Sequence, residues 1–128
     1  MGELKILLVE DEVLIAMLLE RQLSELGLQI SEHVTTGPNA LLSVQKDQPD
    51  LILMDIRLCG SMDGIETAGL IHSQVSPGIP VIFLTSYDDD ATRKRAEGVN
   101  PLGYFGKPLD LEKFKYLMDA TDFSDVRC

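Results

Sequence analysis

The chain has 128 residues, 45% of them hydrophobic, and a formal net charge of −10 at pH 7. This length suits one domain with a core of ordinary size and is too short for two. The negative charge excludes non-specific binding to nucleic acids or to anionic membranes. No apolar segment approaches the roughly 20 residues that span a bilayer, so no membrane insertion is expected. Two cysteines, Cys59 and Cys128, make no disulfide framework, which predicts a reducing, cytoplasmic location.

Apolar runs that suit buried strands alternate with segments of helical periodicity. Leu51 to Met54 is an unbroken apolar run between turn residues, which is typical of a strand buried on both faces. From Glu12 to Leu26 apolar residues recur every three or four positions, and Gly27 then ends the predicted helix. The predicted strands cover residues 4–9, 28–35, 51–55, 81–85 and 103–106, and the predicted helices cover residues 12–26, 37–47, 63–75, 88–98 and 110–120.

Five strands that alternate with five helices require crossover connections. The pattern therefore predicts an α/β fold, with one parallel sheet covered by helices on both faces. No internal repeat or linker interrupts it. We expect one domain over residues 1–122 and a C-terminal tail over residues 123–128.

Polar residues follow the predicted strands at the point where each strand ends. Glu10 and Asp11 follow the first strand, Asp55 the third, Thr85 the fourth and Lys107 the fifth. In a parallel sheet these ends share one edge, where ligands bind in open α/β folds. Three carboxylates so close together need a proton or a cation, and oxygen ligands suit Mg²⁺ or Mn²⁺. The set predicts phosphoryl transfer onto a carboxylate, and the alternative is a group of helix caps with a surface ion pair.

At these positions the sequence resembles the receiver domain of two-component response regulators, which has the CheY-like fold. The resemblance covers roughly Leu4 to Ala120. It implies a doubly wound, flavodoxin-like sheet in the order 2-1-3-4-5. The motifs that carry it, in order, are Leu7-Leu8-Val9-Glu10-Asp11-Glu12, Leu53-Met54-Asp55, Met62-Asp63-Gly64, Leu84-Thr85-Ser86 and Gly103-Tyr104-Phe105-Gly106-Lys107-Pro108.

The resemblance assigns a role to each strand-end residue. It implies that Asp55 is the phosphoacceptor and takes the phosphoryl group from a phosphohistidine. The Mg²⁺ ligands would be Glu10, Asp11, Asp55 and the backbone carbonyl of Arg57. Lys107 would pair with the phosphoryl oxygens. The protein would catalyse only its own phosphorylation and slow autodephosphorylation.

The resemblance also implies a switch and partners. Thr85 would donate its hydroxyl to the phosphoryl group, and Tyr104 would turn inward when Thr85 moves. The Lys107–Pro108 peptide bond would be cis. The expected partner is a sensor histidine kinase or a histidine phosphotransfer domain. The resemblance also allows phosphorylation-dependent self-association.

Two regions depart from the family pattern. Residues 56–62 lack the proline that usually follows the phosphoacceptor and form a loop about one residue longer. Arg57 and Tyr87, two residues beyond Asp55 and Thr85, are bulky. We hypothesise that they hinder the attacking water and prolong the life of the acyl phosphate.

The first predicted helix carries more apolar residues than its inward stripe needs, namely Val13, Leu14, Met17 and Leu18. A broad contact with neighbouring helices is the simpler explanation. The alternative is a docking face for histidine-containing helices. In the fourth helix, Arg93, Lys94 and Arg95 predict a solvated face that offsets the aspartates before it.

Two other functions are consistent with such a fold. An aspartate-nucleophile phosphatase would need a second acid two residues after Asp55, where this chain has Arg57. A receiver-like module that only binds partners would not need the complete set of acids, Thr85 and Lys107. Both alternatives are therefore disfavoured.

Overall fold

The computed structural model describes residues 4–86 and 89–123. Within these residues strands and helices alternate along the chain, as predicted. The elements are β1 (Ile6–Val9), α1 (Val13–Glu25), β2 (Ile30–Val34), α2 (Gly37–Lys46), β3 (Leu51–Asp55), α3 (Gly64–Gln74), β4 (Val81–Thr85), α4 (Asp90–Glu97), β5 (Gly103–Gly106) and α5 (Leu111–Ala120). None of the helices in these two ranges is both long and apolar enough to cross a membrane.

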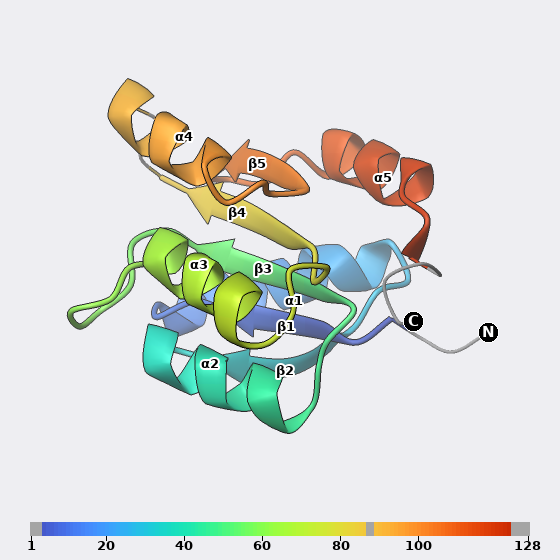
Figure 1. Cartoon of the computed structure of the whole chain (residues 1–128). Helices are drawn as coiled ribbons and strands as arrows, with labels where there is room; N and C mark the ends of the chain where they lie inside the picture. The colour runs from blue at the N-terminus through green and yellow to red at the C-terminus, as the bar shows by residue number, and fades with distance from the viewer. Residues whose placement is uncertain (1–3, 87–88, 124–128) are drawn as a thin grey trace.

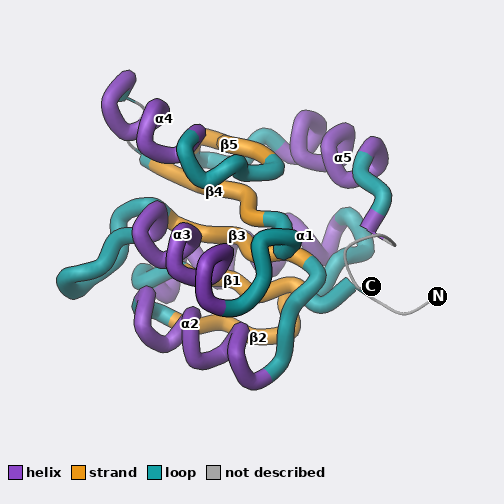
Figure 2. The backbone as a smooth tube through the Cα atoms, in the orientation of Figure 1, coloured by secondary structure: helices purple, strands orange, loops and turns teal. Residues whose placement is uncertain are grey.

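The strands formed by the described residues make one parallel sheet in the order β2-β1-β3-β4-β5 (Figure 1). Helices cover both sides of the strands (Figure 2). The doubly wound α/β fold class and the strand order 2-1-3-4-5 are therefore confirmed. Because all strands run in the same direction, their carboxyl ends lie at one edge of the sheet.

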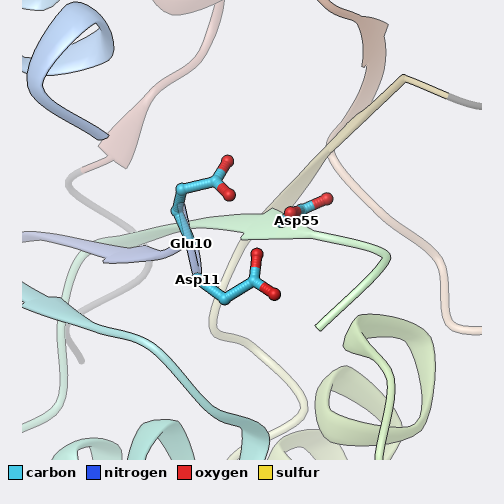
Figure 3. A group of neighbouring side chains, drawn as sticks. All are labelled: Glu10, Asp11 and Asp55. Carbon is cyan, nitrogen blue, oxygen red and sulfur yellow. The ribbon is translucent and has the colours of Figure 1, made fainter. Parts of the chain in front are cut away.

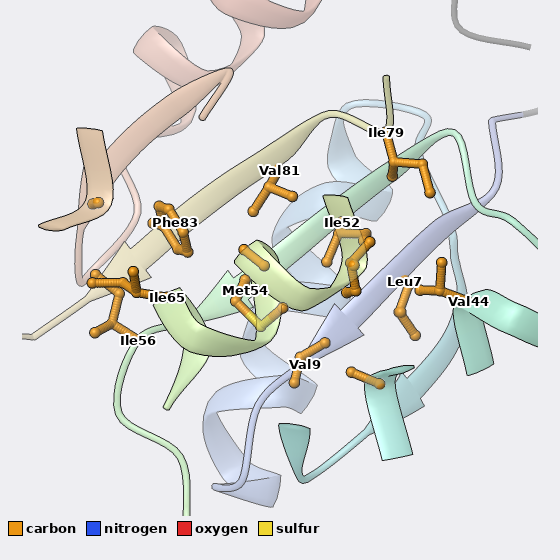
Figure 4. Close-up of a cluster of buried hydrophobic side chains, with 14 residues drawn as sticks. Leu7, Val9, Val44, Ile52, Met54, Ile56, Ile65, Ile79, Val81 and Phe83 are labelled. Carbon is orange, nitrogen blue, oxygen red and sulfur yellow. The ribbon is translucent and has the colours of Figure 1, made fainter. Parts of the chain in front are cut away.

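Successive residues of each strand face opposite sides, so the sheet has two cores. Leu7 and Val9 of β1 belong to a cluster with residues of α2, α3 and α4 (Figure 4). Ile6 and Leu8 of the same strand belong to the cluster with residues of α1 and α5. Apolar packing on both faces therefore fixes the position of β1 and of the acids that follow it.

The start of α3 is fixed against the end of β3. Asp63 caps α3 through the backbone N–H of Glu66, whose side chain accepts from the backbone N–H of Asp63, so the two residues form a capping box. A Cβ atom added at Gly64 would clash with the carbonyl oxygen of Asp55. Glycine at this position lets the helix begin directly beside the last residue of β3.

The outer face of α1 differs from the simpler expectation. Val13, Leu14, Met17 and Leu18 are 59%, 80%, 59% and 49% exposed, so a broad core contact is wrong. Residues share a helix face when they are three or four positions apart. The four extra apolar residues therefore cannot face the core together with the inward stripe. The buried residues of α1 are Ala16, Leu19 and Leu23.

Candidate functional site

Three carboxylates gather at the carboxyl ends of β1 and β3 (Figure 3). Glu10 and Asp11 follow β1, and Asp55 is the last residue of the neighbouring β3. One oxygen of each acid lies within 4.8 Å of an oxygen of the other two. Glu10 and Asp55 are buried, and Asp11 is half-buried. The sheet topology thus concentrates negative charge where little water is present to screen it.

Lys107 brings a positive charge to the two buried carboxylates. Its Nζ atom donates a hydrogen bond of 2.6 Å to Oε1 of Glu10 and lies 3.3 Å from Oδ2 of Asp55. The backbone N–H of Lys107 donates to the carbonyl oxygen of Thr85 over 2.9 Å, which holds the end of β5 against β4. The peptide bond between Lys107 and Pro108 is cis, as the resemblance implies.

The crowded surroundings change the proton affinity of Asp55. Its pKa is raised to about 7, because burial and the neighbouring Glu10 raise it by more than Lys107 lowers it. Burial alone would lower the pKa of Lys107, but its hydrogen bond to Glu10 and the charges of Asp55 and Glu10 outweigh that effect and raise it. Lys107 therefore stays charged near neutral pH, while Asp55 binds a proton more readily than an ordinary aspartate.

The turn after β3 is tied to the acids through its backbone. The N–H of Arg57 donates to Oδ1 of Asp55 over 3.2 Å, and the N–H of Cys59 donates to Oδ2 of Asp11 over 3.1 Å. Above the acids lies a cavity of about 270 Å³. Its lining residues are Asp11, Glu12, Asp55, Arg57, Ser86 and Lys107. Asp55 therefore borders an open cavity although its side chain is largely buried, and Tyr87 lies outside the described residues.

Thr85 and Tyr104 lie on the neighbouring strands β4 and β5. Thr85, the last residue of β4, is buried. Tyr104 is half-buried and packs against the core on the side of α3. The guanidinium carbon of Arg93 from α4 lies 4.4 Å from the centre of the Tyr104 ring, which is a cation–π distance. The structure thus places both predicted switch residues on adjacent strands.

The three acids fit a divalent cation of the Mg²⁺ or Mn²⁺ type. Hard carboxylate oxygens converge on one region, and a cavity beside them leaves room for water or phosphate oxygens. Burial and the neighbouring Glu10 raise the pKa of Asp55, and a cation beside the carboxylate would favour its charged form. Glu10, Asp11 and Asp55 supply this fit, and the backbone carbonyl of Arg57 stays a predicted ligand.

Comparison with known proteins identifies the family. The sequence model of the response regulator receiver domain matches residues 6–119. The chain belongs to this receiver family. Sporulation initiation phosphotransferase F of Bacillus subtilis is a receiver relative with 32% identity over 111 residues, which cover 87% of each chain. Receiver domains are signalling proteins of two-component systems, and histidine kinases or phosphotransfer proteins supply their phosphoryl groups.

Solved structures of receiver domains have the same fold. The signal receiver domain of a modulated diguanylate cyclase from Desulfovibrio desulfuricans has a TM-score of 0.81 and 36% identity, with 92% of each chain covered. The receiver domain of a sensor histidine kinase from Pseudomonas aeruginosa has a TM-score of 0.80 and 28% identity, with 92% of this chain and 96% of that chain covered. That second structure has a magnesium ion coordinated in its active-site cleft.

Longer regulators also contain a segment like this receiver. The transcriptional regulatory protein ZraR of Salmonella typhimurium is 30% identical over 120 residues, which cover 94% of this chain. The chain spans 26% of the length of that relative.

Three contacts beside the site were not predicted from the sequence. The Nε2 atom of His33 on β2 lies 2.7 Å from the carbonyl oxygen of Glu10. In α4, Arg95 pairs with Asp63 over 2.8 Å, and Arg93 lies over the ring of Tyr104. Two of the three cations of the predicted solvated face therefore also attach α4 to its neighbours. The expected strand order already placed β2 beside β1, and this was the feature from which the contact between His33 and Glu10 could have been predicted.

Proposed function

We propose that this receiver takes a phosphoryl group from a phosphohistidine onto Asp55 and then changes its partner-binding surface. One observation carries the proposal. The buried Asp55 carboxylate lies at the floor of an accessible cavity, beside two further carboxylates and the ammonium group of Lys107. Such a site can bind a divalent cation and phosphoryl oxygens together.

The residues have complementary roles in the transfer. An Asp55 oxygen attacks phosphorus, the phosphorus–nitrogen bond breaks, and its electron pair returns to the imidazole of the donor. Lys107 pairs with the phosphoryl oxygens, as its position 3.3 Å from Asp55 allows. When bound, Mg²⁺ neutralises charge on the same oxygens. Its proposed ligands are Glu10, Asp11, Asp55 and the carbonyl of Arg57.

The switch follows from the residues on β4 and β5. Thr85 donates its hydroxyl to the new phosphoryl group, which moves the end of β4. Tyr104 already packs against the core on the side of α3. The move of Thr85 stabilises this inward position and changes the surface formed by α4, β5 and α5. Self-association through that surface is the further consequence we propose, and a cytoplasmic location belongs to the same proposal.

The exposed face of α1 is the proposed docking site for a histidine-containing helix. Its four exposed apolar residues follow Asp11 along the chain within about two helical turns. A mainly apolar cavity of about 260 Å³ adjoins it, lined by residues of α1 and of the segment before α5. An amphipathic helix can place its apolar side on such a surface.

This docking face can be tested by comparing phosphorylation by a protein donor with phosphorylation by a small-molecule donor. Leu14→Ser should slow transfer from a phosphohistidine protein at least tenfold and leave phosphorylation by acetyl phosphate unchanged. Leu42→Ser is a matched control, because Leu42 is 63% exposed but lies on α2. Equal rates for Leu14→Ser and the wild type with the protein donor would exclude this docking face.

Mass spectrometry after treatment with acetyl phosphate and Mg²⁺ tests the central proposal. We expect an increase of one phosphate, which Asp55→Asn abolishes. Asp119→Asn, at an exposed carboxylate on α5, should keep the adduct. A chain that never forms the adduct would be a binding-only module, and sustained hydrolysis of a phosphate ester would indicate a phosphatase.

The life of the acyl phosphate is a separate part of the proposal. The side chain of Arg57 lines the cavity above Asp55, so it can hinder an attacking water. Replacing both Arg57 and Tyr87 with alanine should speed loss of the phosphoryl group once the donor is removed. An unchanged rate in that double variant would defeat this hypothesis.

A further inference from the structure

Glu10 is held at four points although it lies in a turn. Its backbone N–H donates to the carbonyl of Val34 over 3.0 Å, and its own carbonyl lies 2.7 Å from Nε2 of His33. Its Oε1 accepts from Lys107 over 2.6 Å, and its Oε2 accepts from the backbone N–H of Glu12 over 3.1 Å. The residue is fully buried. Two of the four contacts come from β2, which carries none of the three clustered acids Glu10, Asp11 and Asp55.

The contact with His33 defines which ring nitrogen carries a proton. A carbonyl oxygen only accepts hydrogen bonds, so Nε2 of His33 must be the donor. His33 is paired with Leu8 in the parallel register, and Leu8 belongs to the core on the side of α1 and α5. The ring therefore lies on the face of the sheet from which α1 departs. It joins β2 to the turn between β1 and α1.

We propose that His33 is a positioning residue for the acidic cluster. Its bond to the carbonyl of Glu10 fixes the turn that carries Glu10 and Asp11, and it thereby raises the affinity of the site for a divalent cation. The inference rests on the proposed function of these acids as cation ligands. Mg²⁺ demands nearly ideal octahedral geometry, so a small displacement of the turn weakens binding. Loss of such a supporting contact typically lowers metal affinity by about tenfold or more.

The same chain contains a matched contact away from the site. Nε2 of His72 on α3 lies 2.9 Å from the carbonyl oxygen of Ile79. Ile79 precedes β4, whereas Glu10 follows β1, so the two contacts lie at opposite edges of the parallel sheet. Both histidines are half-buried and both ring contacts end on a backbone carbonyl. A variant of His72 is therefore a control, because it loses one such hydrogen bond without a change near the three acids.

The test is the binding of Mg²⁺ and Mn²⁺ to the unphosphorylated full chain by isothermal titration calorimetry. We expect His33→Phe to lower the affinity about tenfold. His33→Gln, whose amide N–H can donate to the same carbonyl, should restore most of it. His72→Phe should bind the cations like the wild type. Equal affinity in His33→Phe and the wild type would overturn the inference, and so would an equal loss in His72→Phe.

A second measurement uses the wild type and does not depend on the folding of any variant. In NMR spectra of the imidazole groups, the Nε2–H signal of His33 should shift when Mg²⁺ is added, whereas that of His72 should not. An unmoved His33 signal at saturating Mg²⁺ would overturn the inference and leave the proposed function intact. A wild type that binds neither Mg²⁺ nor Mn²⁺ would instead overturn the proposed function, and the inference with it.

Discussion

Two charged regions of this molecule, the acidic site and α4, differ in burial. At the acidic site the side chains of Glu10, Asp55 and Lys107 are 0%, 7% and 11% exposed. In α4 the charged residues are exposed, and Ala96 is the buried residue among the eight of that helix. Charges interact strongly where water is excluded and weakly where water screens them.

Because of this difference, a change of charge at Asp55 would act strongly at the site, and α4 is the element that could shift in response. A phosphoryl group added to Asp55 would enter the region where each charge counts most. The helix α4 is held mainly by polar contacts at the surface, such as the ion pair between Arg95 and Asp63. Weakly packed elements open or shift at low free-energy cost. The four predictions below test this contrast between a tightly coupled site and a weakly held helix.

The largest expected effect is the loss of the buried cation. Lys107→Met leaves Glu10 and Asp55 buried without their partner, which should lower the free energy of unfolding by about 5 kcal/mol at pH 8. Lys115→Met is the control, since the pair between Lys115 and Asp119 is exposed and should contribute less than about 0.5 kcal/mol. Urea unfolding with a chelator present measures both. Similar losses of unfolding free energy in the two variants would contradict the contrast between buried and exposed charge.

The pH dependence of stability should report Asp55. Burial raises its pKa to about 7, so between pH 4 and 7 the folded state binds more protons than the unfolded state. The free energy of unfolding of the cation-free protein should therefore fall as pH rises through this window, by roughly 4 kcal/mol. Asp55→Asn should remove most of this slope. Urea unfolding at a series of pH values checks it, and a slope unchanged by Asp55→Asn would refute the assignment to this residue.

The sequence predicted the elements and the convergence of the strand ends because both follow from local patterns. Apolar runs and turn residues mark β3 and β4, and parallel topology then brings Asp55 and Thr85 to one edge. The start of the third helix at residue 63 was predicted for the same reason, since the contacts that cap it lie within one turn.

Contacts between distant side chains were not predictable in this way. His33 and Glu10 are 23 residues apart, and Arg95 and Asp63 are 32 apart, so their meeting depends on how strands and helices pack. The exposure of Leu14 was missed for a related reason. An apolar residue beside an amphipathic stripe has no local signal that distinguishes a core position from a docking face.

A smaller effect is expected at the junction of α3 and α4. Asp63→Ala removes the N-cap of α3 and the partner of Arg95, which should cost about 1–2 kcal/mol. Arg95→Met removes only the exposed ion pair and should cost less than about 1 kcal/mol. Hydrogen exchange should show faster exchange of α4 amides in both variants, with α3 affected only by Asp63→Ala. Slower exchange in α4 than in α3 of the wild type would contradict the assignment of α4 as the weakly held helix.

The smallest expected effect is at the ring of Tyr104. Arg93→Met removes the cation 4.4 Å from the ring centre, which should cost about 0.5–1 kcal/mol. Because the cation covers the half-buried ring in its inward position, its loss should also raise the fraction of outward Tyr104, measured by NMR of the ring protons. Lys94→Met, at the next and equally exposed position, is the control and should change neither quantity. If Arg93→Met leaves the ring signals unchanged, packing against the core alone determines where Tyr104 lies, and α4 is coupled to the site through Asp63 rather than through the ring.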